Sequence, residues 1–343
     1  MNETRQRLVE EAQRTIAAGS KSFRFASQIF DLPTRERSWL LYSWCRACDD
    51  ITDGQTLGHD AVSVDHPQER IAFLRAHTDS ALAGQPTGLV PFDSLGVVAA
   101  ETRIPADLPH DHLAGFSRDA AGWTPATEDD LLSYCYQVAG AVGVMMAHVM
   151  GVDPAQRDTL DRASDLGIAF QLANIARDIV DDAKVGRSYI PTDWNGGDLD
   201  PLDPAHRDRL VEVAQRLAAL AHRYRASSKI GAARLPFRSR WAVLSAAAIY
   251  GEVATRAVEL GPRAWDKRIS ISKAEKFMLV AGACLEAVLP PRKASREGLW
   301  TRPEAPHTTR HAELVSASTA APRVVAPGKD PHAPAIDPET SSG

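Results

Sequence analysis

The segment QLANIARDIVDD, residues 171–182, restricts the fold of this chain more than any other part of its sequence. Residues four apart lie on one face of an α-helix, so Asn174, Asp178 and Asp182 form a column with Gln171 beside it. Most other side chains in the segment are apolar, whereas a surface helix usually has a broad polar face. Carboxylates one turn apart also repel each other. The pattern predicts a helix that faces an internal cavity and binds something cationic; the alternative is an amphipathic helix with its acids in water.

A second pair of acids lies near residue 50. The helix predicted from Pro33 to about Asp53 carries Asp49 and Asp53 one turn apart, and Arg46 lies one turn before Asp49. A single DDxxD pattern is weak evidence, because short acidic runs are common on solvated surfaces. Two such pairs, each on a helix rich in apolar residues, predict that both helices face one cavity.

The composition indicates a helical protein with a large core. Hydrophobic residues make up 44% of the 343 residues, alanine is abundant and aromatic residues are few, which favours helix over sheet. We expect an all-α fold, since no segment shows convincing strand alternation. No stretch of about 20 uncharged apolar residues occurs, so no membrane-spanning helix is expected.

Charge and cysteine content restrict the partners and the compartment. A net charge of −5 argues against nucleic acid as a partner. The N-terminal segment predicts a charged amphipathic helix rather than a signal peptide, and four cysteines make no disulfide framework, which fits a reducing cytoplasm. Cys45 and Cys48 form a CxxC pattern inside a predicted helix, but no second ligand pair follows, so we expect neither a redox nor a zinc site.

The chain divides into a helical domain and a tail. Helices are expected at about residues 3–18, 33–53, 67–83, 89–102, 107–119, 127–150, 154–182, 205–230, 241–260 and 271–288. Nine prolines follow residue 289, mixed with serine, threonine and histidine. The sequence therefore predicts a single domain over residues 1–290 and a disordered tail over 291–343 without a catalytic role.

Small residues cluster on one face of the helix expected at 127–150, at Gly140, Gly143, Ala147 and Gly151. Small side chains allow a close approach from outside the helix. They indicate either tight packing of another helix or one wall of an apolar tunnel, and the sequence leaves both interpretations open.

The two carboxylate pairs indicate a chemistry. All-oxygen ligand sets suit Mg²⁺ or Mn²⁺, and Mg²⁺ is commonly shared between one or two carboxylates and substrate phosphates. Additional cations for a highly charged phosphate group are Lys21, Arg46, Arg177, Arg187 and Arg268. The glycine-rich loop of nucleotide-binding proteins is absent and the walls are apolar, so we expect a diphosphate attached to an apolar chain. The hydroxyls and cations of residues 20–24 are a further candidate phosphate site, or an ordinary helix cap.

Loss of such a diphosphate to bound metal ions leaves an allylic carbocation. The cation must be kept from water, and aromatic faces stabilise it electrostatically. Candidates for that role are Phe23, Tyr42, Tyr134 and Tyr250.

Five segments together resemble the bacterial phytoene synthases of the squalene and phytoene synthase family. They are SKSF at 20–23, YSWCRACDDITD at 42–53, YCYQVAGAVG at 134–143, GIAFQLANIARDIVDDAKVGRSYIP at 167–191 and KRISISKAEK at 267–276. The resemblance covers about residues 15–290 and leaves out the proline-rich tail. Gly251 departs from the pattern, because an arginine is common after the tyrosine at that place.

The resemblance implies an all-α isoprenoid synthase fold, a helical bundle around a central cavity. It implies head-to-head condensation of two geranylgeranyl diphosphates through prephytoene diphosphate to phytoene, with release of two diphosphates, the first committed step of carotenoid biosynthesis. The expected metal ligands are Asp49, Asp53, Asn174, Asp178 and Asp182. The expected substrate-binding residues are Ser20, Lys21, Ser22, Phe23, Arg46, Gln171, Asn174, Arg177, Arg187, Tyr189 and Arg268. Tyr42, Tyr134 and Tyr250 are expected to line the reaction cavity as catalytic residues alongside the aspartates.

Three alternatives compete with this interpretation. The nearest is a dehydrosqualene or squalene synthase that uses two farnesyl diphosphates, because tunnel depth decides substrate length. A non-catalytic helical assembly factor would be free to lose the aspartates, which are intact here. A head-to-tail prenyltransferase or terpene cyclase would lack the RSYIP and SKSF segments.

The expected cofactor is Mg²⁺ or Mn²⁺, and no NADPH is expected because no dinucleotide fingerprint occurs. A hydrocarbon product needs an apolar exit, so we expect a cytoplasmic protein bound peripherally to the inner face of the membrane. Other enzymes of carotenoid synthesis are further expected partners, and nucleic acid is not.

Overall fold

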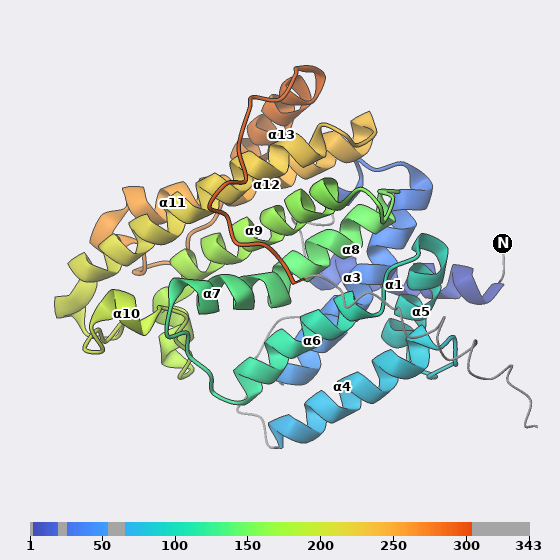
Figure 1. Cartoon of the computed structure of the whole chain (residues 1–343), viewed down its shortest axis with the longest axis horizontal. Helices are drawn as coiled ribbons and strands as arrows, with labels where there is room; N and C mark the ends of the chain where they lie inside the picture. Colours follow the sequence, from blue (N-terminus) through green and yellow to red (C-terminus); the bar gives the residue numbers. More distant parts are fainter. Residues whose placement is uncertain (1–2, 20–25, 54–65, 304–343) are drawn as a thin grey trace, which may run out of the picture. The chain divides into compact units, whose positions relative to one another are not determined.

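The computed structural model describes residues 3–19, 26–53 and 66–303, and over these the chain is helical without a strand (Figure 1). The N-terminal helices are α1 (Glu3–Gly19), α3 (Leu32–Asp53), α4 (Pro67–Leu82), α5 (Val90–Thr102) and α6 (Asp107–Ala120). Then follow α7 (Glu128–Cys135), α8 (Ala141–Val149), α9 (Arg157–Lys184), the short α10 (Thr192–Asn195), α11 (Arg207–Ala232), α12 (Phe237–Glu259) and α13 (Lys273–Val288). The predicted all-α fold class is confirmed.

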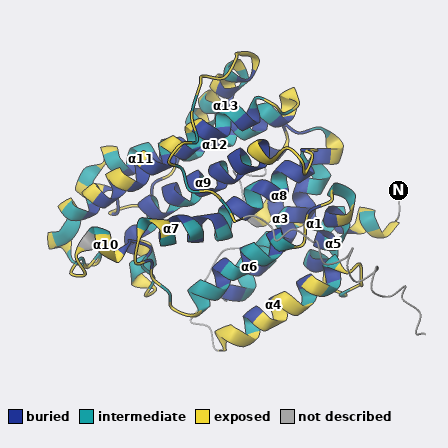
Figure 2. Cartoon of the chain, in the orientation of Figure 1, coloured by how far each residue is buried: buried dark blue, intermediate teal, exposed yellow. Residues whose placement is uncertain are grey.

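Helix α9 occupies the centre of this arrangement and packs against α8, α11 and α12 (Figure 1). It is buried along much of its length, as Figure 2 shows, because apolar residues such as Leu172, Ile175 and Ile179 occupy most of its faces. The indole Nε1 of Trp265 donates a 3.1 Å hydrogen bond to the carbonyl oxygen of Ala176. The acidic segment thus lies on an interior helix rather than on a solvated one.

Tight packing explains the small residues that precede α9. A Cβ atom added at Gly143 would overlap the carbonyl oxygen of Ala163, and one added at Gly167 would overlap that of Ala139. The two helix backbones therefore touch. Gly143 and Ala147 also line the cavity described below, so both interpretations of the small face hold.

Several helix boundaries differ from the sequence prediction; α12, for example, begins at Phe237 rather than at Trp241. Thr127 caps its helix with Asp130 as expected, but a π-helical turn at Tyr136–Gly140 interrupts the helix between α7 and α8. Helix α9 begins at Arg157 rather than at Pro154, because the residues before it form a turn. In that turn the Asp153 carboxylate accepts a 2.8 Å hydrogen bond from the backbone N–H of Ala155.

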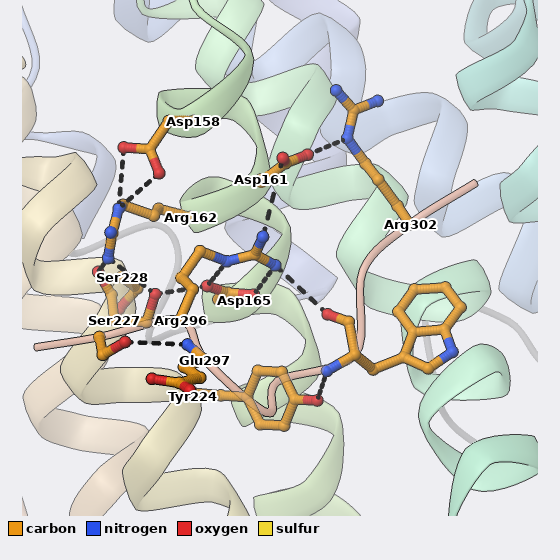
Figure 3. A network of polar contacts seen from close by, with 12 residues as sticks. Asp158, Asp161, Arg162, Asp165, Tyr224, Ser227, Ser228, Arg296, Glu297 and Arg302 are labelled. Atoms are coloured by element: carbon orange, nitrogen blue, oxygen red, sulfur yellow. Dashed lines mark hydrogen bonds and ion pairs between the residues drawn. The ribbon is translucent and has the colours of Figure 1, made fainter. Parts of the chain in front are cut away.

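The compact unit extends past the predicted end of the domain at residue 290 and runs to Arg302. Arg296 binds both carboxylate oxygens of Asp165 at 2.8 Å, and Arg302 Nε lies 2.7 Å from the carboxylate of Asp161 (Figure 3). The backbone N–H of Trp300 donates to the hydroxyl of Tyr224. Residues 291–302 were assigned to the tail because they begin the proline-rich C-terminal segment, but Arg296 and Arg302 bind them to the domain. Residues 304–343 of the predicted tail lie outside the described residues.

Candidate active site

A cavity of about 660 Å³ lies between α3, α6, α8, α9 and α12. Asp49 from α3 and both Asp178 and Asp182 from α9 line it, although Asp49 and Asp178 are 129 residues apart in the sequence. The wall beyond the acids is largely apolar and includes Met146 and Leu166. One cavity therefore joins a carboxylate-lined region to a long apolar region.

The two carboxylates of α9 that line the cavity lie close enough for the charge of Asp178 to affect the ionisation of Asp182. Arg177 forms an ion pair with Asp178, with Nε at 2.7 Å from Oδ1. Burial, with the neighbouring charge of Asp178 next in importance, raises the pKa of Asp182 to about 7. Gln171 and Asn174 line the same stretch of the cavity and add amide oxygens. A cation bound between these oxygens would stabilise the charged form of both carboxylates.

The carboxylates of α3 are arranged differently. Arg46 Nε and Nη2 lie 3.0 and 2.9 Å from Asp50 Oδ1, and Arg46 Nη1 lies 3.7 Å from Asp49 Oδ2. Asp49 is 42% exposed in its side chain, so it remains accessible from the cavity. Asp53 is the last residue of α3, and its side chain lies outside the described part of the structure, as do Ser20, Lys21, Ser22 and Phe23.

A pair of stacked tyrosines shares one acid that the sequence did not reveal. The hydroxyls of Tyr134 and Tyr189 donate hydrogen bonds of 2.9 and 3.0 Å to the two carboxylate oxygens of Asp119. Their rings stack with centroids 4.9 Å apart, and burial raises the pKa of both phenols. All three residues line the cavity, and Asp119 also contributes to the raised pKa of Asp182. Asp119 forms no spacing pattern with another acid in the sequence, so only its neighbours in space could identify it.

Tyr42 and Tyr250, two more of the predicted aromatic residues, also line the cavity. Tyr42 lies beside the acids of α3, and burial raises its pKa to about 12. Tyr250 is half-buried and stacks on Phe170, with ring centroids 4.1 Å apart. The Arg225 guanidinium fills the space that the missing side chain of Gly251 leaves.

Among the predicted site residues whose side chains the structure describes, Arg268 alone does not line the cavity. It is exposed in the segment before α13, whereas Arg46, Arg177, Arg187 and Tyr189 line the cavity. It was expected to bind diphosphate as one of the chain's cations and from the family resemblance, but in this arrangement its side chain lies outside the cavity.

The donor set fits a divalent cation that a ligand helps to bind. Within the described residues, no group of three or more His, Cys, Asp or Glu side chains is close enough to form a complete metal site. Mg²⁺ does not require one, because it binds through one or two carboxylates together with waters and phosphate oxygens. Asp178, Asp182 and the amide oxygen of Asn174 supply oxygen ligands on one side of the cavity.

Solved structures with this helical arrangement are isoprenoid synthases. A dehydrosqualene synthase crystal structure is 25% identical, with a TM-score of 0.72, and the match covers 82% of this chain and 96% of that one. A squalene synthase from Alicyclobacillus acidocaldarius is similar in fold at 19% identity, with a TM-score of 0.66 over 76% of this chain and 97% of that one.

Residues 16–275 match the family described as squalene/phytoene synthase, and the chain belongs to that family. A 15-cis-phytoene synthase of Pantoea ananas is 42% identical over 308 residues, which are 86% of this chain and 98% of that protein. A 15-cis-phytoene synthase of a Paracoccus species is 43% identical over 304 residues, with the same coverage. The resemblance drawn from the motifs is thereby confirmed.

No helix in the described ranges has the length and apolar character needed to cross a membrane.

Proposed function

We propose that this chain is a prenyltransferase that condenses two molecules of geranylgeranyl diphosphate head to head to phytoene. The observation that carries the proposal is the meeting of Asp49 with Asp178 and Asp182 at one apolar cavity. Relatives called 15-cis-phytoene synthase, 42% and 43% identical over almost their whole length, support the choice of substrate and product.

The proposed reaction has two ionisation steps, and different residues of the cavity bind the diphosphates and stabilise the cations. The first diphosphate leaves as its carbon–oxygen bond breaks, and the double bond of the second substrate attacks the allylic cation, forming cyclopropyl prephytoene diphosphate on loss of a proton. The second diphosphate then leaves, the skeleton rearranges, and loss of a second proton gives phytoene. Arg177 and Arg187 bind diphosphate oxygens, while the faces of Tyr42, Tyr134 and Tyr250 stabilise the cations. The apolar wall excludes water, which would otherwise capture them.

Mg²⁺ or Mn²⁺ is the proposed cofactor, held by Asp49 and Asp53 on one side and by Asn174, Asp178 and Asp182 on the other. Bound metal neutralises the departing diphosphate. Chelation with EDTA should abolish turnover, and addition of Mg²⁺ should restore it; turnover that survives chelation would contradict this assignment.

The second candidate function is condensation of two farnesyl diphosphates, favoured by the similarity in fold to a dehydrosqualene synthase. Incubation of the chain with Mg²⁺ and either the C15 or the C20 diphosphate distinguishes the two by the mass of the hydrocarbon. We expect a C40 product from the C20 substrate and a much lower rate with C15. A C30 hydrocarbon as the main product would assign the alternative.

Peripheral binding to the inner face of the cytoplasmic membrane is part of the proposal. The product is a hydrocarbon without polar groups, so its transfer through water is strongly unfavourable. An enzyme that rests on a bilayer can release such a product directly into it.

A further inference from the structure

Helix α13 presents an apolar outer face. Five large apolar residues on it are between 57% and 69% exposed: Phe277, Met278, Leu285, Val288 and Leu289. Such residues occur singly on most protein surfaces, whereas a contiguous exposed group indicates an interaction site.

The smaller exposed residues of α13 complete this face. Ala274, Ala281 and Gly282 lie between the large side chains, so an arc of about 140° around the helix contains no polar residue. The opposite face, with Val280 and Ala283, is buried against α12, at the outer edge of the bundle in Figure 1. The helix is therefore apolar on both sides, and only one side has a partner within the described residues.

The acids of α13 turn away from the apolar face. Glu275 is bound to Arg256 at 2.5 Å, and Glu286 is bound to Lys229 at 2.7 Å. Both pairs lie along the borders of the helix with α11 and α12. The outer face consequently carries no negative charge that would repel an anionic partner.

Cations flank the face at both ends. Exposed basic residues precede and begin the helix and follow its end: Lys267, Arg268, Lys273, Arg292 and Lys293. Three acids lie between residues 266 and 293: Asp266 is exposed, and Glu275 and Glu286, which are partly exposed, are each paired with a cation. An apolar helix face bordered by basic residues is the pattern of helices that lie in the interface of anionic bilayers.

We propose that the outer face of α13 binds the surface of an anionic lipid bilayer, with its apolar side chains among the acyl chains and the flanking cations at the headgroups. The proposal rests on the membrane association proposed above and names the surface responsible for it. Arg268, which lies outside the cavity, is one of the cations proposed to bind the headgroups.

A second copy of the chain fits this face less well. In a symmetric antiparallel pair of α13 helices, Lys273 of each copy would approach Arg292 and Lys293 of the other. The contact would bring cations together at both ends, and like charges at an interface are unfavourable. The headgroups of an anionic bilayer would instead attract these cations.

The test is sedimentation of the full-length protein with phosphatidylcholine vesicles that contain, or lack, phosphatidylglycerol. We expect binding to the anionic vesicles, weaker binding to the neutral ones, and a decrease with added salt. The double variant Met278→Ser/Leu285→Ser should lower the partition coefficient roughly tenfold or more, because two large exposed side chains no longer enter the bilayer.

The matched control is Leu32→Ser/Leu202→Ser, which removes two apolar side chains that are 60% and 49% exposed on other elements. It should bind vesicles as the unmodified protein does. Equal binding by both double variants would overturn the proposal. A change from dimer to monomer in the α13 variant, with unchanged vesicle binding, would assign the face to a second copy instead.

Turnover measured with detergent-dispersed substrate separates this inference from the proposed reaction. The α13 variant should retain full turnover in detergent, whereas Asp178→Asn should lose turnover and keep vesicle binding. Loss of turnover in the α13 variant with intact vesicle binding would contradict the role of this face.

Discussion

At the scale of single residues, local spacing and spatial neighbours carry different information. Asp178 and Asp182 are one turn apart, so their convergence follows from helix geometry alone. Asp119 is separated by 70 residues from Tyr189, and its hydrogen bond to that hydroxyl is visible only in the folded chain. Both kinds of residue lead to specific predictions.

Replacing Asp178 with asparagine should reduce kcat by about 10²–10³-fold, because one negative ligand for the metal and diphosphate is lost. The matched control is Asp181→Asn, since Asp181 is exposed on the same helix and bound only to Lys184 among the described contacts. Steady-state kinetics with the C20 substrate measures both. Equal losses in the two variants would contradict the assignment of Asp178.

Replacing Asp119 with alanine leaves two buried phenol hydroxyls without their acceptor. The expected cost is about 1–3 kcal/mol of unfolding free energy for each hydroxyl. Urea denaturation measures it, and a double-mutant cycle checks the cause. In the background Tyr134→Phe/Tyr189→Phe, Asp119→Ala should cost much less; an unchanged cost would show that the hydroxyls are not the reason.

At the scale of elements, close helix contact and a buried ion pair determine the packing around α9. Gly143 and Gly167 let the preceding helix touch α9, and Arg296 joins the C-terminal segment to Asp165, whose carboxylate is fully buried (Figure 3). The contribution of each interaction to stability can be measured by comparing a substitution there with a similar substitution at an exposed position.

Gly143→Ala should destabilise the protein by about 1–3 kcal/mol, because the added methyl group meets a backbone carbonyl that cannot move aside. Gly282→Ala on α13 is the control, since an added Cβ there meets no atom within 4 Å. That control should stabilise the helix by about 0.5–1 kcal/mol. Thermal unfolding distinguishes the two, and a harmless Gly143→Ala would mean that the helices separate easily.

Arg296→Met should cost about 3–5 kcal/mol, because it leaves the carboxylate of Asp165 buried without its cation. Burial already raises the pKa of Asp165, and Arg296 opposes that shift. Arg209→Met, which removes a surface ion pair with Asp198, should change the free energy of denaturant unfolding far less. Equal behaviour of the two variants would show that the segment after residue 290 contributes little to stability.

At the scale of the whole molecule, the site is assembled from helices that lie far apart in the sequence. Helices α3 and α9 bring acids to one cavity, yet the described residues do not form a complete metal cage. This arrangement predicts that metal and diphosphate bind together rather than independently.

Mg²⁺ with a non-reactive prenyl diphosphate analogue should therefore raise the Tm by several degrees, and either component alone should raise it much less. Differential scanning calorimetry measures the three conditions, with Asp178→Asn as the control that abolishes the joint effect. A full shift with Mg²⁺ alone would indicate a preformed metal site.

The sequence alone determined the fold class, the family and the polar residues of α3 and α9 that line the cavity, because these depend on periodicity and on motifs that local geometry brings together. Arg268 was expected at the site because of its charge and the family resemblance, but its outward position depends on how the segment before α13 leaves the core. The extension of the folded unit to Arg302 could not be predicted from a proline-rich stretch, because it depends on Asp161 and Asp165 more than 130 residues earlier. Tertiary structure alone decided that Tyr134 and Tyr189 bind Asp119, and that Arg296 and Arg302 bind acids of α9. Contacts between such distant segments follow from packing and not from spacing in the sequence.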